Sequence, residues 1–187
     1  MEFKVLSADE CEQVRIWRNS CLESLRTPYL LTNEQQFDFF KNVICNREAK
    51  ARYWGIWKTV NMVVAQYRPD GVVHNARDED VYSLIGMAGI ENIEWENRRG
   101  EISLIIDPQY RSMGNGDDAF KILLDKAFNE LNLLNIWGVC YECNPAVSFW
   151  ERQINKYNAF NAMLQNMKYF NGQYWRGLYF SYERGNQ

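Results

Sequence analysis

Apolar residues recur at three- and four-residue spacing in several stretches of the chain, which is the spacing of one helix face. The clearest stretch follows Gly116 and forms a single apolar stripe: Phe120, Leu123, Leu124, Ala127, Phe128 and Leu131. An earlier helix is predicted from a cap at Ser7 or Asp9 to about Leu25, and another begins at residues 32–34. A last helix is predicted after Asn144-Pro145, because a helix tolerates proline in its first turn.

Short apolar runs and alternating patterns between these helices predict strands at residues 2–6, 53–60, 81–90, 101–106 and 135–141. The pair Asn171-Gly172 favours a tight turn, which would fold residues 159–170 back along residues 173–182 as a hairpin. Residues 66–80 contain a proline, an Asp-Gly pair and the single histidine, His74. We expect this stretch to be a solvated loop between two strands.

The order of these elements predicts an α/β fold: a mixed sheet of about seven strands flanked by about four helices. The strands on either side of the helix at residues 117–131 are expected to be parallel, joined by a crossover connection. A chain of 187 residues has the usual length of one domain, so residues 1–187 are expected to form a single domain.

Charge and composition narrow the classes of partner. The net charge is −3, the isoelectric point is near 5.3 and no run of Lys and Arg occurs, so no nucleic-acid partner is expected. The N-terminus lacks a signal-peptide pattern, and no window contains the roughly 18 apolar residues that span a bilayer. A cytoplasmic protein without a membrane partner is therefore expected, and its five scattered cysteines are expected to stay reduced.

The run Arg111-Ser112-Met113-Gly114-Asn115-Gly116 connects a strand to the striped helix. Two glycines permit close backbone approach to a ligand, and a helix start presents free N–H groups with the positive end of its dipole. Together these features favour a phosphate site, although a tight turn alone explains a lone Gly-x-Gly. The run lacks the Gly-Lys-Ser/Thr of a P-loop and the third glycine of a dinucleotide-binding turn.

The run from residue 86 to 151 resembles the GCN5-related N-acetyltransferases, the GNAT superfamily. Arg111, Gly114 and Gly116 match the acetyl-CoA motif Gln/Arg-x-x-Gly-x-Gly/Ala, after a strand, residues 101–108, of the form Glu-Ile-x-Leu-x-Ile-x-Pro. The stretch Asn-Pro-Ala-Val-x-Phe-Trp-Glu at residues 144–151 resembles the segment beyond the cofactor. Residues 15–19, Arg-Ile-Trp-Arg-Asn, resemble the first helix of the ribosomal-protein and nucleotide-sugar acetyltransferase branch.

The resemblance implies an enzyme that transfers an acetyl group from acetyl-CoA to a primary amine without a metal. It also implies the residues that bind the acyl donor. These are the backbone of Leu104, Ile105 and Ile106, the loop Arg111, Ser112, Met113, Gly114, Asn115 and Gly116, and the side chains of Asn144 and Trp150. A simple N-cap remains an alternative for Asn144. The acceptor is expected to be a small amine or amino-sugar rather than a peptide, and the protein a monomer or homodimer.

Glu101 is the first candidate for the catalytic base, because some members of the family carry their catalytic glutamate at this strand position. Burial would raise the pKa of its carboxyl toward neutrality. Two alternatives are an ion pair with Arg98 or Arg99 and a water relay without a side-chain base. Glu91 and Glu142 are weaker candidates.

Three departures from the family pattern qualify this interpretation. Asp117 stands where Ser or Thr often follows the last glycine, and a carboxylate there would repel pyrophosphate unless it turns away. Trp150 stands where many members carry a tyrosine that acts as general acid, and an indole is a poor proton donor. Residues 154–160 replace the usual Leu-Gly-Phe. A non-catalytic acyl-CoA-binding module is therefore the alternative function.

Two further patterns point elsewhere. Cys140 and Cys143 have the spacing of a dithiol redox site or half of a zinc site, although only one histidine is present to complete the zinc site. Arg15 and Arg18 could bind an anionic acceptor such as a nucleotide-sugar phosphate, or simply form a solvated helix face.

Overall fold

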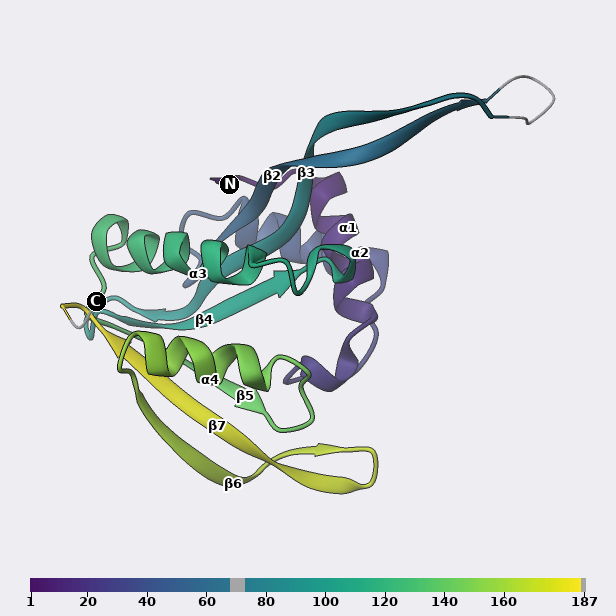
Figure 1. The fold of residues 1–187 in the computed structure, drawn as a ribbon. Coiled ribbons are helices and arrows are strands. Elements are labelled where there is room, and N and C mark those ends of the chain that lie inside the picture. The colour runs from purple at the N-terminus through teal and green to yellow at the C-terminus, as the bar shows by residue number, and fades with distance from the viewer. Residues whose placement is uncertain (68–72, 186–187) are drawn as a thin grey trace.

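The computed structural model describes residues 1–67 and 73–185. Within them, one seven-stranded sheet has the order β1-β2-β3-β4-β5-β7-β6 (Figure 1). Its strands are β1 Glu2–Lys4, β2 Arg52–Tyr67, β3 Val73–Glu94, β4 Arg99–Ile106, β5 Asn135–Tyr141, β6 Phe160–Phe170 and β7 Gln173–Glu183. The α-helices are α1 Ala8–Asn19, α2 Asn33–Phe39, α3 Asn115–Asp125 and α4 Val147–Lys156. The predicted mixed α/β fold is confirmed.

Two helices cover each face of the sheet, with α3 and α4 on one side and α1 and α2 on the other (Figure 1). The larger core lies under α3 and α4, where the predicted stripe of α3 packs on Ile56, Ile90 and Ile102 of the sheet. A smaller core under α1 joins Cys11, Val14 and Trp17 to Leu84. The sheet is therefore buried on both faces at its centre, which explains its continuous apolar runs.

The ends of α1 and α2 follow local capping signals. The Ser7 hydroxyl accepts the Glu10 N–H while the Glu10 carboxylate accepts the Ser7 N–H, and Thr32 and Gln35 repeat this capping box at α2. The first helix ends at Asn19, six residues before the predicted end, and a short 3₁₀ turn, η1 (Leu22–Ser24), follows. The Ser20 hydroxyl bonds the Trp17 carbonyl at 2.8 Å, a side-chain bond of the kind that competes with helix continuation.

The prediction of a loop at residues 66–80 was wrong for most of that stretch. The ladder between β2 and β3 continues outward from Val60↔Val81 to Gln66↔Asn75, so the two strands form a long projecting arm (Figure 1). His74 lies in β3, and residues 68–72 lie outside the described residues. Arg77, Asp78 and Asp80 are exposed, as their charge predicts, but exposure does not exclude backbone pairing. In a two-stranded ribbon the backbone groups between the strands pair with each other, and water can bind the outer ones.

The β6–β7 hairpin agrees with the prediction almost to the residue. Phe170 pairs with Gln173, and both turn residues have positive φ, 52° for Asn171 and 79° for Gly172. This is the backbone that a two-residue hairpin turn requires, and Asn-Gly is its preferred sequence. The helix α4 ends at Lys156, and β6 begins at Phe160, which settles where the hairpin starts after the unusual stretch 154–160.

The pairing of β4 with β5 is short, and it creates an opening in the sheet. The two strands are parallel, as predicted, but only Arg99, Gly100 and Glu101 pair with Asn135, Ile136 and Trp137. Beyond this point β4 remains paired only with β3, up to Ile106, and β5 only with β7, up to Tyr141. The C-terminal halves of β4 and β5 therefore separate, next to the first residues of α3 and α4.

Trp150 ties α4 to the sheet. Its side chain is 9 % exposed; its ring stacks on Phe180 of β7 at 4.6 Å between centroids and meets the edge of Phe120 of α3 at 5.6 Å. Aromatic contacts of this kind add to the free energy of burial. The indole therefore has a packing role that joins three elements.

We expect Trp150→Ala to lower the free energy of unfolding by about 3–5 kcal/mol, because it leaves a cavity among α3, α4 and β7. Trp150→Phe should lose much less, since an aromatic ring remains against Phe180. Equilibrium urea unfolding measures both. Trp95, 42 % exposed in the turn after β3, provides the control, and Trp95→Ala should change the free energy by about 0.5 kcal/mol or less. Similar losses for Trp150→Ala and Trp95→Ala would contradict the packing role.

Candidate active site

A cavity of about 430 Å³ lies where β4 and β5 separate. The ends of β4, the loop before α3 and the start of α4 form three of its walls, and the segment after α1 forms the fourth. Its lining contains most of the residues named from the sequence: Leu104, Ile105, Ile106, Arg111, Ser112, Gly114, Gly116, Asn144 and Trp150. Residues separated by up to 46 positions are thus brought to one site by the gap in the sheet.

The loop before α3 has the backbone that a phosphate cradle needs. Gly114 is the N-cap of α3 with φ +78°, and a Cβ built on it would meet nothing within 4 Å, so it faces open space in the cavity. The helix starts at once, because Asp117 N–H donates to the Gly114 carbonyl at 3.0 Å. The first N–H groups and the positive dipole end of α3 therefore face the cavity, an arrangement that fits the pyrophosphate of a CoA thioester.

Gly116 has a different reason to be glycine. A Cβ there would lie 3.1 Å from Cε2 of Phe149, so the residue leaves room for an aromatic ring of α4. Arg111 fixes the loop to the strand, because its Nε donates to the Ile106 carbonyl at 3.0 Å. The side chains of Met113 and Asn115 do not line the cavity: Met113 is exposed, while Asn115 is buried between Lys58 and the Tyr110 carbonyl. Only the backbone of these two residues can contribute to a cradle.

Asn144 connects two walls of the cavity. Its Oδ1 accepts the Ser24 hydroxyl at 3.0 Å and the Ala146 N–H at 2.9 Å. Ala146 is the N-cap of α4, so Asn144 satisfies a backbone group at the helix start without being the cap residue itself. The same side chain therefore orders α4 and holds η1 against it.

Lys168 is a residue that the sequence analysis missed. It is buried in β6, where its ammonium donates to the carbonyls of Leu22 and Glu23 at 3.2 and 2.6 Å and lies over the rings of Tyr141 and Phe170. Burial lowers the pKa of Lys168. This contact fixes η1, whose last residue Ser24 lines the cavity together with the flanking residues Cys21 and Leu25. An isolated lysine in a hairpin carries no local signal of such a contact.

Glu101 is buried in β4 and bonded to two side chains. Its carboxylate forms an ion pair with Arg26 and accepts Asn92 Nδ2 at 2.8 Å. The partners expected from the sequence lie elsewhere, with Arg98 on Asn132 and Arg99 nearest Glu94. Arg26 stands 75 positions away in the chain, so no sequence spacing could indicate it. Glu101 is not part of the cavity lining but lies three residues before Leu104 on the same strand.

A second carboxylate lies beside Glu101. Glu91 is its direct partner across β3 and β4, so both side chains leave the same face of the sheet. The Tyr53 hydroxyl donates to Glu91, and burial together with this carboxylate raises the pKa of Tyr53 well above its usual value. Glu142 is separate from this group and forms an ion pair with Arg176 at 2.5 Å.

The cysteine pair and the two arginines of α1 contribute to the fold and not to a second site. Burial raises the pKa of Cys140 to about 12, whereas a redox dithiol needs a lowered one. Among the described residues no cluster of metal-binding side chains occurs. Arg15 binds Glu12 and the Leu31 carbonyl, and Arg18 binds Thr27 and the Tyr29 carbonyl. Both arginines thus support the segment before α2 instead of a free helix face.

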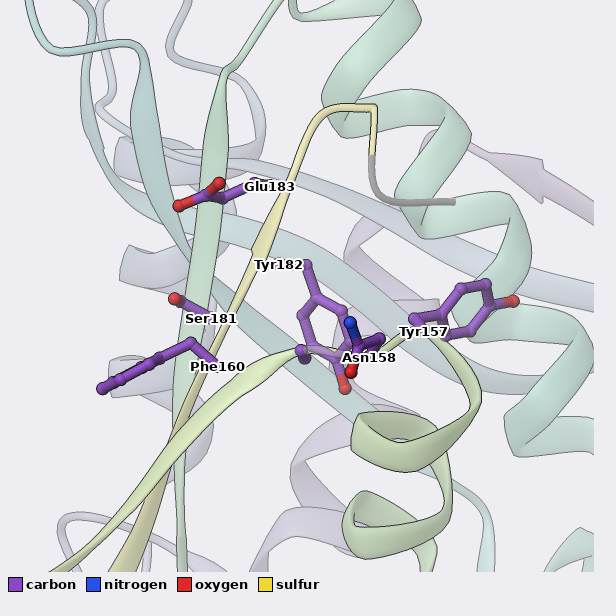
Figure 2. A pocket seen from close by; sticks show the side chains of 7 residues that line it. Tyr157, Asn158, Phe160, Ser181, Tyr182 and Glu183 are labelled. Carbon is purple, nitrogen blue, oxygen red and sulfur yellow. The ribbon is translucent and has the colours of Figure 1, made fainter.

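A second cavity, of about 320 Å³, lies at the far end of β7. Figure 2 shows Tyr157 and Asn158 after α4 near Tyr182, with Phe160, Ser181 and Glu183 beside them. None of the residues predicted to bind the acyl donor or to act as the base lines it, and it lacks the glycine loop and open strand edge of the first cavity.

In the part of the chain that the structure describes, no helix has the length and apolar character to cross a membrane.

The acetyltransferase (GNAT) domain family matches residues 6–148, which is most of the chain. No curated protein matches in sequence. Similar solved structures include a spermidine N-acetyltransferase from Vibrio cholerae in complex with CoA and spermine, at 16 % identity and a TM-score of 0.74, covering 99 % of this chain and 96 % of that one. Mutant forms of the spermidine/spermine N-acetyltransferase SpeG from the same organism match at 18 % identity, a TM-score of 0.71, and 98 % and 93 % coverage.

These solved structures share the fold with this chain, and a further structure of the Vibrio cholerae spermidine N-acetyltransferase is described as dodecameric. They are spermidine or spermidine/spermine N-acetyltransferases, so they support the family but not the ribosomal-protein and nucleotide-sugar branch predicted from residues 15–19. The family match, the seven-stranded sheet and the cradle before α3 agree with one another. The chain belongs to the GNAT acetyltransferases and is an acetyl-CoA-dependent N-acetyltransferase that acts on a primary amine.

Proposed function

We propose that the acceptor is a small, positively charged primary amine and that Glu101 receives its proton. The observation that carries this proposal is the cation already bound to Glu101: Arg26 reaches this buried carboxylate from a segment that borders the cavity. The Arg26 side chain is 53 % exposed, so it can leave without disturbing the core. A substrate ammonium would replace the guanidinium as the partner of Glu101.

The charge around Glu101 favours a cation over an anion. Glu91 and Glu101 leave the same face of the sheet side by side, and Arg26 is the cation paired with Glu101. Two carboxylates in direct cross-strand contact repel each other, so a second positive charge would stabilise them. Arg15 and Arg18, which could have bound an anionic acceptor, are occupied by the chain itself. The spermine bound to the Vibrio cholerae protein is an amine of the proposed kind.

Three parts of the site would perform three tasks: binding of the acyl donor, stabilisation of the acyl oxygen, and removal of the ammonium proton. Gly114 and the start of α3 would hold the pyrophosphate of acetyl-CoA, which supplies the activated acyl group as a thioester. Along Leu104, Ile105 and Ile106, those backbone N–H groups that point to the open edge of β4, away from β3, would stabilise negative charge on the acyl oxygen. Glu101 lies about 10 Å before Leu104 along β4, and would take the ammonium proton directly or through one water.

Trp150 leaves the thiolate without a tyrosine to protonate it. Its indole packs on Phe180, so it contributes shape and not a proton. A thiol has a pKa near 8.5, which makes its thiolate a stable leaving group that needs little help from an acid. The departure from the family pattern at this position is therefore compatible with turnover.

Gly114→Ala tests the cradle, and Gly172→Ala is its matched control. Both glycines have nearly the same φ, +78° and +79°, and neither has an atom within 4 Å of a built Cβ. Each substitution should cost about 1 kcal/mol of stability, because alanine is strained at positive φ. Only Gly114→Ala places a methyl group in the cradle, so calorimetry should show at least a tenfold weaker affinity for acetyl-CoA in that variant alone. Equal affinities in the two variants would remove Gly114 from the site.

Glu101→Gln tests the proposed base. Glutamine keeps the shape and can still accept a hydrogen bond from Arg26, but it cannot take a proton. We expect kcat/KM for a primary amine to fall by about 10²–10⁴ with little change in thermal stability. Glu142→Gln removes a carboxylate outside the cluster and should leave kcat/KM unchanged. Turnover near the wild-type level in Glu101→Gln at pH 7 would show that water, without this side chain, removes the proton.

A further inference from the structure

Asp117 places a negative charge at the edge of the cradle. It is the third residue of α3 after the N-cap Gly114, and it lines the cavity together with Gly114 and Gly116. A carboxylate in this position competes with an anionic ligand for the same helix N-terminus and repels it. The cradle can bind a pyrophosphate well only if this carboxylate is held away from it.

Gln153 of α4 holds the Asp117 carboxylate. Its Nε2 donates to Oδ1 of Asp117 at 2.6 Å, a short bond of the charge-assisted kind. The Gln153 side chain is fully buried, at 0 % exposure, so this amide lies inside the protein between α3 and α4. The bond draws the carboxylate toward α4.

The other half of the Gln153 amide shows that the bond to Asp117 is what the residue contributes. Within the described residues, Oε1 of Gln153 is buried without a hydrogen-bond partner. A buried unpaired acceptor is unfavourable, and a leucine or methionine of similar volume would avoid it. Rotating the amide would not help, because it would set the amide oxygen against the carboxylate. The role of this amide is therefore carried by its NH₂ group, while its oxygen stays without a hydrogen bond.

We propose that Gln153 is a positioning residue that keeps the Asp117 carboxylate turned toward α4, so that the cradle keeps its affinity for the diphosphate of the acyl donor. The inference rests on the proposed binding of pyrophosphate at Gly114. Gln153 contacts no substrate and acts only through Asp117. Its bond to Asp117 lets the chain accommodate an acidic residue where a hydroxyl residue is usual in the family.

The test is a double-mutant cycle of Gln153→Leu and Asp117→Asn, with acetyl-CoA affinity measured by calorimetry and turnover measured separately. Gln153→Leu frees the carboxylate, so the affinity for acetyl-CoA should fall about tenfold or more while kcat at saturating acetyl-CoA stays within about twofold. Adding Asp117→Asn to Gln153→Leu removes the charge and should restore the affinity to that of Asp117→Asn alone. The ratio of acetyl-CoA affinity in wild type to that in Gln153→Leu should fall toward one as the salt concentration rises, because salt screens the repulsion between Asp117 and the ligand.

Gln36→Leu is the matched control. Gln36 is also buried and donates its Nε2 to a carbonyl, that of Cys11, at 2.8 Å, but it lies in α2 on the other face of the sheet. Its replacement should leave acetyl-CoA affinity unchanged. Should Gln153→Leu fail to fold, as judged by thermal unfolding, Gln153→Met replaces it in the cycle.

Two results would overturn the proposal. Unchanged affinity in folded Gln153→Leu would show that Asp117 needs no restraint, and a defect that Asp117→Asn does not repair would assign Gln153 to packing alone. Failure of the proposed cradle is distinguishable, since it would appear as unchanged affinity in Gly114→Ala. Failure of the proposed base role of Glu101 would appear as unchanged turnover in Glu101→Gln and would leave the calorimetric cycle intact.

Discussion

The short parallel contact between β4 and β5 is the constraint on which the rest of the site depends. Three residue pairs hold the strands together, and beyond Glu101 and Trp137 each strand keeps only its antiparallel neighbour. Along residues 104–106, the backbone groups that point toward β5 pair with no strand there, so they are available to a ligand. The helices α3 and α4 begin beside the same gap, so two helix starts and one open strand edge meet in one cavity.

A single segment, residues 21–26, completes this cavity, and polar contacts from three distant elements hold it in place. Lys168 of β6 binds the carbonyls of Leu22 and Glu23, Asn144 binds Ser24, and Glu101 of β4 binds Arg26. None of these contacts is a hydrophobic core contact, and Arg26 is half exposed. This wall is therefore fixed by directional bonds, of which the bond between Arg26 and Glu101 is the one proposed to exchange with a substrate, while Trp150 and Phe120 hold the opposite wall by packing.

The site separates two kinds of charge on the two sides of the open strand. The start of α3 carries the positive end of its dipole, which would attract the acyl donor, while Glu91 and Glu101 lie side by side and would attract the proposed ammonium acceptor. The exception is Asp117, a carboxylate on the anion-binding side. In our proposal Gln153 reduces the repulsion between this carboxylate and the acyl donor by holding it toward α4, and not by adding a positive charge. In the proposed arrangement, opposite fields would hold the donor and the acceptor on different sides of β4, so that the amine approaches the acyl carbon of the donor from the side away from the anion-binding loop.

The sequence alone determined the parts of this protein that depend on neighbouring residues. The stripe of α3, the bounds of β5, the Asn171-Gly172 turn and the glycine loop at residues 111–116 all rest on periodicity or on local backbone preference, which act within a few residues. Only the tertiary structure decided the partner of Glu101, the contact of Lys168 and the bond between Gln153 and Asp117. It also turned residues 73–80 from an expected loop into a strand. The three side-chain contacts join residues between 36 and 146 positions apart, and the pairing of residues 73–80 with β2 joins residues between 6 and 19 positions apart. Only the folded chain brings these residues together, so no local pattern records them.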